Sequence, residues 1–217
     1  MGCYVLQHFE INKTKVLNNA QAFRLARNKW QSLQLLSAYG LPIPSTSYIG
    51  ELVESSSQLA LHFPSVVLKT LVGMQGTGVE LYEETSTALN KLKMLKQVGE
   101  KALVQDFIAE TRGQDIRAFV IGDQVVASMQ RTAGNGDFRA NLHQGGKAES
   151  IELTEEEKRI AIQATKAIRL DVAGVDLIRT KQGPMILEVN ASPGLEGIET
   201  VSGKDIAGMM VDYLLGI

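Results

Sequence analysis

The chain has 217 residues, and its 22 lysines and arginines against 24 aspartates and glutamates give a formal net charge of −2. A nearly neutral chain has no general electrostatic attraction to nucleic acid or to an anionic membrane, so we expect neither as a partner. The single cysteine, Cys3, excludes an intramolecular disulfide framework. The sequence has no secretion signal, and its apolar runs are far shorter than the roughly 20 residues that cross a bilayer. With the single cysteine, these features predict a soluble cytoplasmic protein.

Three segments have the apolar spacing or the end signals of a helix. Residues 20–39 carry apolar side chains at helical spacing, and Gly40 follows where a helix commonly ends in a left-handed residue. A second helix is predicted over residues 87–98. A third begins after Thr154, because Thr154 and Glu157 have the spacing of a capping box.

The segments between these helices have the composition and alternation of strands. The predicted strands cover residues 65–70, 78–82, 102–105, 117–121, 124–128, 174–178 and 184–190. Gly122 and Asp123 form a tight turn between two of them, and residues 181–183 join the last pair. Antiparallel hairpins interspersed with helices predict an α+β fold. A change in composition near residue 110 predicts two units, a small first lobe with the N-terminal helices (1–109) and a larger second lobe (110–217).

A glycine-rich loop, Gly-Met-Gln-Gly-Thr-Gly at residues 73–78, joins two predicted strands, and Lys69 lies on the strand that leads into it. Glycines let backbone amides approach an anion closely. The loop is not a P-loop, because no Gly-Lys-Ser/Thr and no helix follow, and it lacks the context of a dinucleotide fingerprint. The residues alone leave two interpretations open, a loop that folds over phosphates and a surface hairpin turn.

Asp176, Glu188 and Asn190 are the strongest candidate for a metal site. Glu188 and Asn190 are two residues apart on a strand and therefore share a face. In a hairpin centred on Gln182, Asp176 lies opposite Glu188, with the β-carbons about 5 Å apart. Two carboxylates this close in apolar strands require a cation or a shared proton. Oxygen ligands of this kind suit magnesium or manganese rather than zinc. The alternative is a solvated polar face of the sheet.

Basic residues gather between the predicted hairpins. Arg139 and Asn141 have strand spacing, and with Arg131 they can hold phosphate or carboxylate oxygens, whereas a solvated glycine-rich loop is the alternative. Asp115 opens a strand and has two interpretations, as a ligand of a ribose or as the ion-pair partner of Arg117.

Four segments together resemble the ATP-grasp superfamily, and within it the RimK type, which adds glutamate to the C-terminus of a ribosomal small-subunit protein. They are residues 67–79, 136–143, 173–176 and 187–198. The Asn-Ala-Ser-Pro-Gly motif that begins at Asn190 is specific for the RimK and lysine-biosynthesis branch. The resemblance runs from about residue 18 to the end and implies a nucleotide held between two α+β lobes. Because members carry a further N-terminal α/β domain before this point, we expect most of that domain to be missing here.

The resemblance also implies roles for single residues. Lys29, which on its own reads as a solvated helix lysine, and Lys69 match phosphate-contacting lysines, and the glycine loop matches a lid. Positions matching nucleotide-binding residues are Lys29, Lys69, Gly73, Gln75, Gly76, Thr77, Gly78, Asp106, Phe107, Asp115, Arg139, Ala140 and Asn141. Ala140 replaces a usual serine. Asp176, Glu188 and Asn190 match the magnesium ligands, and Arg131 lies near a position that contacts the acyl phosphate or the substrate carboxylate.

These observations predict an ATP-dependent carboxylate–amine ligase that forms an amide through an acyl phosphate. ATP and magnesium or manganese, as two ions, are the expected cofactors. Lys69, Arg131 and Arg139 are the expected catalytic residues, because they neutralise charge at the reacting phosphate. By resemblance, the substrates are glutamate or a similar amino acid and a protein or peptide C-terminus, and a homo-oligomer is compatible with the chain. The alternatives are a ligase for small molecules or a carrier protein, and a truncated ATP-binding module without catalysis.

Overall fold

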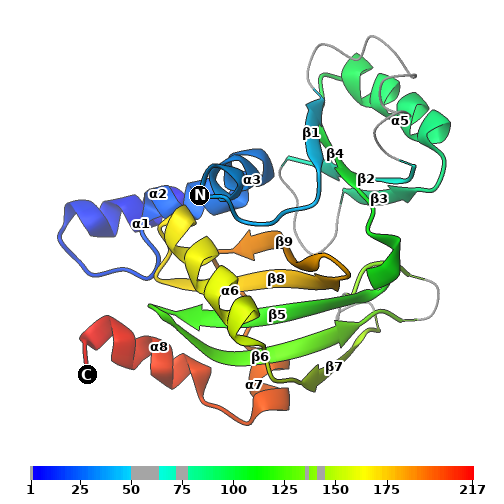
Figure 1. Ribbon diagram of the computed structural model, residues 1–217. Helices are drawn as coiled ribbons and strands as arrows, with labels where there is room; N and C mark the ends of the chain where they lie inside the picture. The colour runs from blue at the N-terminus through cyan, green and yellow to red at the C-terminus, as the bar shows by residue number, and fades with distance from the viewer. Residues whose placement is uncertain (1, 50–63, 72–77, 135–136, 141–144) are drawn as a thin grey trace.

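Two antiparallel sheets form the framework of the protein, and helices pack on each of them (Figure 1). The computed structural model describes residues 2–49, 64–71, 78–134, 137–140 and 145–217. Within these ranges the first sheet has four strands in the order β1-β4-β2-β3, and the second has five in the order β7-β6-β5-β8-β9. The pairings in both sheets are antiparallel, which confirms the predicted α+β class.

The first sheet precedes the second in the chain. Its strands are β1 (Thr46–Ile49), β2 (Val66–Thr70), β3 (Val79–Tyr82) and β4 (Ala102–Asp106). The second sheet contains β5 (Gln114–Ile121), β6 (Gln124–Thr132), β7 (Lys147–Ser150), β8 (Val172–Thr180) and β9 (Gly183–Asn190). The described helices are α1 (Gly2–Ile11), α2 (Ala20–Arg27), α3 (Lys29–Ala38), α5 (Thr85–Gln97), α6 (Glu155–Ile168), α7 (Glu196–Ser202), α8 (Ile206–Leu215) and the 3₁₀ turn η1 (Ala109–Thr111).

The predicted strands all occur, whereas the sequence did not predict β1, β7 and the helices α1, α7 and α8. Both missed strands have four residues, so their alternation is a weak signal, and the sequence did find the equally short β3. None of the described helices is long and apolar enough to cross a membrane.

Alternation of side chains gives the first sheet two different faces. Val66 and Leu68 of β2 pack with Ala88 and Leu92 of α5, and all four are at most 3% exposed. Lys69 belongs to the opposite face, because neighbours along a strand point in opposite directions. That opposite face is turned toward the second sheet.

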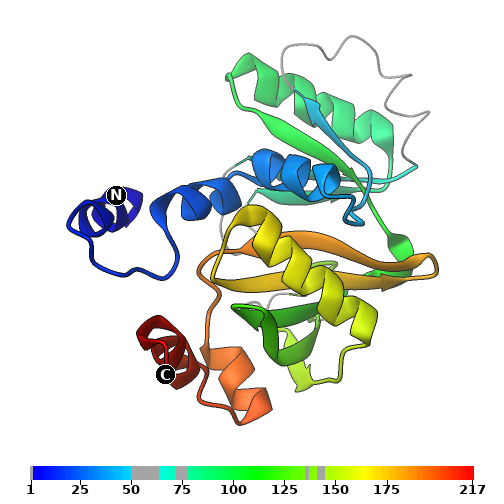
Figure 2. The same cartoon turned by 60° about the vertical axis from the view of Figure 1, so that its left-hand side comes forward.

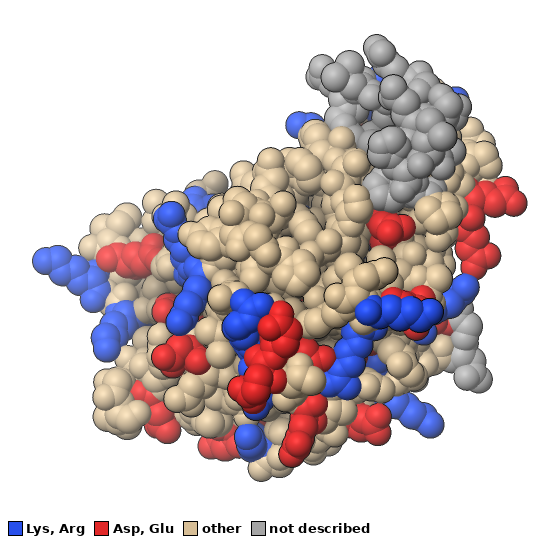
Figure 3. Space-filling model, in the orientation of Figure 1, with Lys and Arg blue, Asp and Glu red and all other residues tan. Residues whose placement is uncertain are grey.

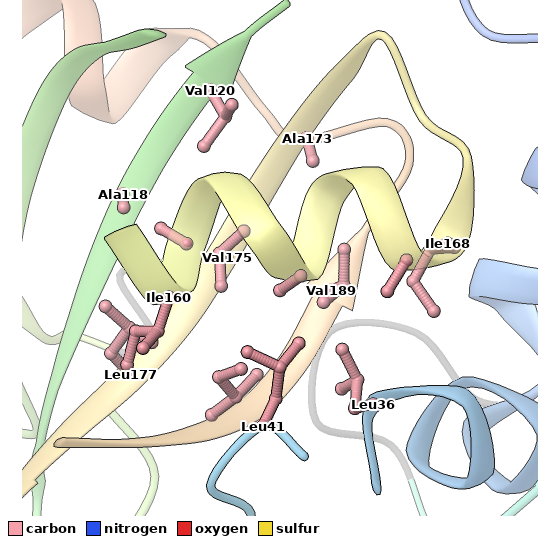
Figure 4. Close-up of a cluster of buried hydrophobic side chains, with 14 of the residues drawn as sticks. Leu36, Leu41, Ala118, Val120, Ile160, Ile168, Ala173, Val175, Leu177 and Val189 are labelled. Atoms are coloured by element: carbon pink, nitrogen blue, oxygen red, sulfur yellow. The ribbon is translucent and has the colours of Figure 1, made fainter. Parts of the chain in front are cut away.

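Helix α6 covers one face of the second sheet. Its Ile160 and Ile168 meet Val175 and Leu177 of β8 and Val189 of β9 in a buried apolar cluster (Figure 4). Burying a side chain of this size contributes about 1.5–3 kcal/mol relative to exposure. The capping box predicted at the start of α6 is present and fixes where this helix begins.

The other face of the second sheet is divided between apolar and charged side chains. Phe119 of β5 and Met129 of β6 pack with Ile198 of α7 and Ile206 of α8. Arg117 lies two residues before Phe119 and therefore shares this face. One end of the face thus belongs to the core, and the other is available for a polar site.

Positive and negative side chains are interspersed over the outer side of α6 (Figure 3). Lys158 pairs with Glu155 at 2.7 Å and Arg159 with Glu156 at 2.7 Å, each one helical turn apart. Exposed pairs of this kind contribute about 0–1 kcal/mol. The buried face of α6, rather than these pairs, therefore holds the helix on the sheet.

The single helix predicted over residues 20–39 is wrong, because Asn28 interrupts it. Asn28 has φ −93° and ψ 100°, and its side chain accepts a hydrogen bond from the backbone N–H of Gln31 at 3.1 Å. It therefore ends α2 and caps α3 at the same time. The break places Lys29 at the start of α3, where its backbone N–H donates to Leu71 O at 3.3 Å, just after β2.

Helix α3 contacts both sheets. It packs on α6 and β9 of the second sheet, beside which it lies in Figure 2. Its Trp30 stacks on Tyr48 of β1, with the ring centroids 5.4 Å apart. The division of the chain at residue 110 stays a prediction.

The hairpin of β8 and β9 is not centred on Gln182. Thr180 pairs with Gly183, so the turn consists of Lys181 and Gln182. The register then shifts between Leu177 and Asp176, opposite the extra residue Leu187, and this bulge brings Asp176 opposite Glu188. The predicted pairing of the two carboxylates is therefore confirmed, although a bulge rather than the turn produces it.

Gly174 of β8 allows the loop after β9 to approach the sheet closely. A β-carbon at this position would lie 2.7 Å from the Cβ of Pro193 and 3.5 Å from Arg117 Nε. The absence of a side chain at Gly174 therefore leaves room both for the Pro193 loop and for the guanidinium of Arg117.

We expect Gly174→Ala to lower the free energy of unfolding by about 1–3 kcal/mol, because the added methyl group forces Pro193 or Arg117 to move. Gly194→Ala is the matched control, since a β-carbon there meets nothing within 4 Å. Urea denaturation of both variants measures the effect. Equal stabilities of the two variants would contradict the close-packing argument.

Candidate active site

A cleft with a volume of about 200 Å³ lies between the two sheets. The first sheet, the start of α3, the segment around η1 and the second sheet all contribute to its walls. The predicted site residues that line it are Lys29, Lys69, Asp106, Phe107, Asp115, Arg139, Ala140, Asp176 and Glu188. The fold therefore brings together side chains that are up to about 160 residues apart in the sequence.

Apart from Gly78, the remaining predicted residues fall into two groups. Gly73, Gln75, Gly76, Thr77 and Asn141 lie outside the described residues, so their predicted role stays a prediction. Arg131 and Asn190 contact Asp176 but are not among the residues described as lining the cleft.

Gly78, at the end of the glycine loop, closes the hairpin of β2 and β3. Its carbonyl oxygen accepts a hydrogen bond from the backbone N–H of Thr70 at 2.9 Å. Its φ is +75°, and a β-carbon there would collide with Thr70 Oγ1. Only glycine fits this position without strain, so the last residue of the loop is required by the backbone whether or not the loop binds phosphate.

Four charged side chains form a buried network on the second sheet. Arg117 donates to both oxygens of Asp176 at 2.8 Å, and Arg131 donates to both oxygens of Asp115 at 2.6 and 2.7 Å. Arg131 also lies 3.1 Å from Asp176 Oδ2, to which Asn190 Nδ2 donates at 3.2 Å. Asp115 thus pairs with Arg131 rather than with Arg117, because the strand register places Asp115 opposite Arg131 and Arg117 opposite Asp176.

The network shifts the pKa values of its two carboxyl groups in opposite directions. Burial disfavours ionisation of Asp176, but the charges of Arg117 and Arg131 outweigh burial and hold its pKa below the usual range. Burial raises the pKa of Asp115 to about 6, and the negative charge of Asp176 acts in the same direction against the opposing effect of Arg131. Asp176 is therefore the firmly ionised member of the two.

Asp176, Glu188 and Asn190 offer oxygen ligands alone, which fits a hard divalent cation. In the described residues Asp176 Oδ1 accepts only from Arg117 Nε, so this oxygen retains a lone pair. The side chain of Glu188 is 38% exposed, with Lys29 Nζ 3.8 Å from its Oε1. No three His, Cys, Asp or Glu side chains gather in a metal-binding arrangement in the described part of the chain, so the amide of Asn190 completes the candidate set.

Two lysines face these carboxylates. Lys69 Nζ donates to Gln105 Oε1 at 2.6 Å. Burial lowers the pKa of Lys69 from 10.5 to about 8; Lys29 acts in the same direction, and Glu188 and Asp176 act against it. The cleft therefore contains a desolvated cation that a phosphate group can pair with.

Apolar and aromatic side chains also line the cleft. Phe107 and Phe138 form an edge-to-face pair with centroids 6.1 Å apart, and Leu187 lines the cleft as well. Arg139 lies over the ring of Phe138 at 5.7 Å and is held by the carboxylate of Asp137, whose Oδ2 accepts from it at 2.9 Å. A flat heterocycle fits against the apolar side chains, while anionic groups fit beside the lysines.

The comparisons with known proteins agree with this geometry. A profile of the RimK-like ATP-grasp domain matches residues 26–214. The chain belongs to the RimK-like ATP-grasp family. A probable alpha-L-glutamate ligase of Haemophilus influenzae is 56% identical over 214 residues, which cover 99% of this chain and 71% of the relative.

Solved structures of the ATP-grasp ligase PsnB share the fold. PsnB complexed with its minimal precursor has a TM-score of 0.78 at 26% identity, over 99% of this chain and 68% of PsnB. PsnB complexed with minimal precursor, Mg and ADP has a TM-score of 0.76 at 25% identity, over 99% of this chain and 66% of PsnB. The protein is therefore an ATP-grasp ligase, as the motifs predicted.

The sequence did not identify Gln105 and Phe138, which line the cleft, or Arg117, which donates to both oxygens of Asp176. Arg117 was considered only as a partner of Asp115, two residues away on the same strand. Its real partner, Asp176, lies on the neighbouring strand. Knowledge of the register would have identified Arg117, because it places a cation directly opposite the buried carboxylate.

We expect Arg117→Lys to lower the free energy of unfolding by about 1–3 kcal/mol, because lysine cannot reproduce the paired hydrogen bonds to a buried carboxylate. Arg112→Lys is the control, since Arg112 pairs with Glu83 at an exposed position and such pairs contribute about 0–1 kcal/mol. Chemical denaturation of both variants is the measurement. An effect of Arg112→Lys as large as that of Arg117→Lys would contradict the importance of burial.

The lowered pKa of Lys69 predicts a pH dependence of nucleotide affinity. Below about pH 8 Lys69 is charged and attracts phosphate, and above it the charge is lost. We expect the affinity for ADP without divalent metal to fall about tenfold between roughly pH 7 and pH 9.5. Calorimetric titration of the wild type and of Lys69→Arg, which stays charged, measures this loss. A wild-type profile identical to that of Lys69→Arg would refute the assignment.

Proposed function

We propose that the protein joins glutamate to the carboxyl end of a protein or peptide, with ATP and magnesium, through an acyl phosphate. The observation that carries the proposal is the lining of the cleft, which combines aromatic side chains with a buried lysine and two carboxylates on facing walls. Relatives named probable alpha-L-glutamate ligase support glutamate as the amino acid, and the precursor bound by PsnB supports a peptide as the acceptor.

In this proposal the adenine of ATP lies against Phe107 and Leu187, two of the apolar side chains that line the cleft. The phosphates then extend toward Lys29 and Lys69, and the glycine loop that follows β2 is their proposed cover. Arg139, held by Asp137, is a proposed cation partner of the phosphates. Asp115 and Asp106, which also line the cleft, are the proposed partners of the ribose and adenine.

Asp176, Glu188 and Asn190 would hold magnesium, and PsnB complexed with Mg and ADP supports this choice of ion. When bound, the ion neutralises charge on the terminal phosphates. Arg117 and Arg131 keep Asp176 ionised, which is the state that a cation requires of its ligand. The presence of two ions stays a prediction.

The reaction proceeds in two displacements. A carboxylate oxygen of the acceptor attacks the γ-phosphorus, the bond to the β-phosphate oxygen breaks, and ADP leaves. The amine of glutamate then attacks the acyl carbon, orthophosphate leaves with the bonding electron pair, and the amine gives up one proton to solvent. Lys69 and Arg139 stabilise the charge on the transferred group, and direct contact of Arg131 with substrate stays a prediction.

The decisive experiment supplies the protein with ATP, magnesium, glutamate and peptides with free C-termini. Chromatography of the nucleotides and mass spectrometry of the peptides are then compared for the wild type and Glu188→Gln. We expect ADP, orthophosphate and peptides extended by glutamate, and at least about a 100-fold loss of turnover in Glu188→Gln at unchanged melting temperature. AMP and pyrophosphate as main products, or equal turnover of the two proteins, would overturn the mechanism. Turnover with free amino acids instead of peptides would identify a small-molecule ligase.

A further inference from the structure

Three polar side chains from different strands share the cleft face of the first sheet. Thr46 of β1 lies directly opposite Gln105 of β4, and Gln105 lies opposite Val67 of β2. Lys69 is two residues beyond Val67, so it shares the face and occupies the diagonal position to Gln105. Long side chains reach one another across such a diagonal.

The hydrogen bonds among these residues run in one direction. Thr46 Oγ1 donates its single hydrogen to Pro44 O at 2.8 Å, so it acts as an acceptor toward its other neighbour. Gln105 Nε2 donates to Thr46 Oγ1 at 2.9 Å. The other end of the amide, Oε1, therefore points to Lys69 Nζ, which donates to it at 2.6 Å.

Because Gln105 is buried, only this orientation of its side-chain amide gives both of its ends a hydrogen-bond partner. Gln105 is 2% exposed, and no buried side-chain nitrogen or oxygen of the described residues lacks a hydrogen-bond partner. Turning the amide over would place Nε2 against the ammonium of Lys69 and Oε1 against Thr46 Oγ1, whose hydrogen is already used. Both contacts would then lose their hydrogen bonds in a site that water does not reach freely.

We infer that Thr46 and Gln105 are positioning residues, which hold the ammonium of Lys69 at the phosphate end of the cleft. The inference rests on the proposed function, because it assumes that Lys69 binds phosphate. A lysine has four rotatable side-chain bonds, and an unanchored one loses that freedom when it binds a ligand. Gln105 restricts it beforehand, while Glu188, Asp176 and Lys29 are the charged groups around it.

The test is a double-mutant cycle on ADP affinity, measured by calorimetry without divalent metal. Gln105→Met removes the amide at similar volume, and Lys69→Met removes the ammonium. We expect Gln105→Met to weaken ADP binding about tenfold in the wild type and by less than about twofold in the Lys69→Met background. A merely structural role of Gln105 would give the same factor in both backgrounds, and this result would overturn the inference.

A second pair of variants tests the series of hydrogen bonds from Thr46 through Gln105 to Lys69 without changing Gln105. Thr46→Ser keeps the hydroxyl group and should bind ADP as the wild type does, whereas Thr46→Val should weaken binding about threefold or more. Thermal melting shows whether each variant folds. Equal ADP affinities of the serine and valine variants would contradict a positioning role of the Thr46 hydroxyl group.

The phosphate-binding role of Lys69 and the positioning role of Gln105 are contradicted by different results. If Lys69→Met binds ADP as tightly as the wild type, the role of Lys69 in the proposed function is wrong, and the positioning inference falls with it. If Lys69→Met binds weakly while Gln105→Met acts equally in both backgrounds, only the positioning inference is wrong.

Discussion

The buried network of Arg117, Asp176, Arg131 and Asp115 is the constraint on which the second sheet depends. Its charges alternate across β5, β6 and β8, and each carboxylate receives paired hydrogen bonds from a guanidinium. Buried charges of this kind are tolerated only when every member has its partners. A slip of one residue in any of these strands would turn a charged side chain to the α6 face and leave its partner unpaired. The network therefore specifies the register more strictly than apolar packing alone.

That register determines what each face of the sheet can do. With the charged residues on the cleft side, the alternating positions, including Val175 and Leu177, must face α6 and form the core. The bulge at Leu187 then brings Glu188 opposite Asp176. One local irregularity in β9 thus adds a second carboxylate to the site without disturbing the core face, where Val189 stays buried.

Features that depend on neighbouring residues could be predicted from the sequence, whereas features that depend on distant contacts could not. The capping box of Thr154 and Glu157 and the Gly122-Asp123 turn depend on neighbouring residues, and both are present. The family resemblance identified nine of the nineteen residues that line the cleft. The break at Asn28, the bulge at Leu187 and the partner of Arg117 depend on contacts with distant strands or on competition between two conformations. Composition and spacing do not contain that information.

Two lysines and two carboxylates lie on facing walls of the cleft, and this limits what fits between them. Lys29 and Lys69 lie on the side of α3 and the first sheet, whereas Asp176 and Glu188 lie on the second sheet. A bare phosphate chain would meet the carboxylates, and a bare cation would meet the lysines, so each alone has one repulsive wall. A nucleotide that carries its cation presents both charges, and each faces the wall of opposite sign. The balance of charge in the cleft thus favours nucleotide and cation as a single unit, which is the substrate form that the proposed ligase reaction requires.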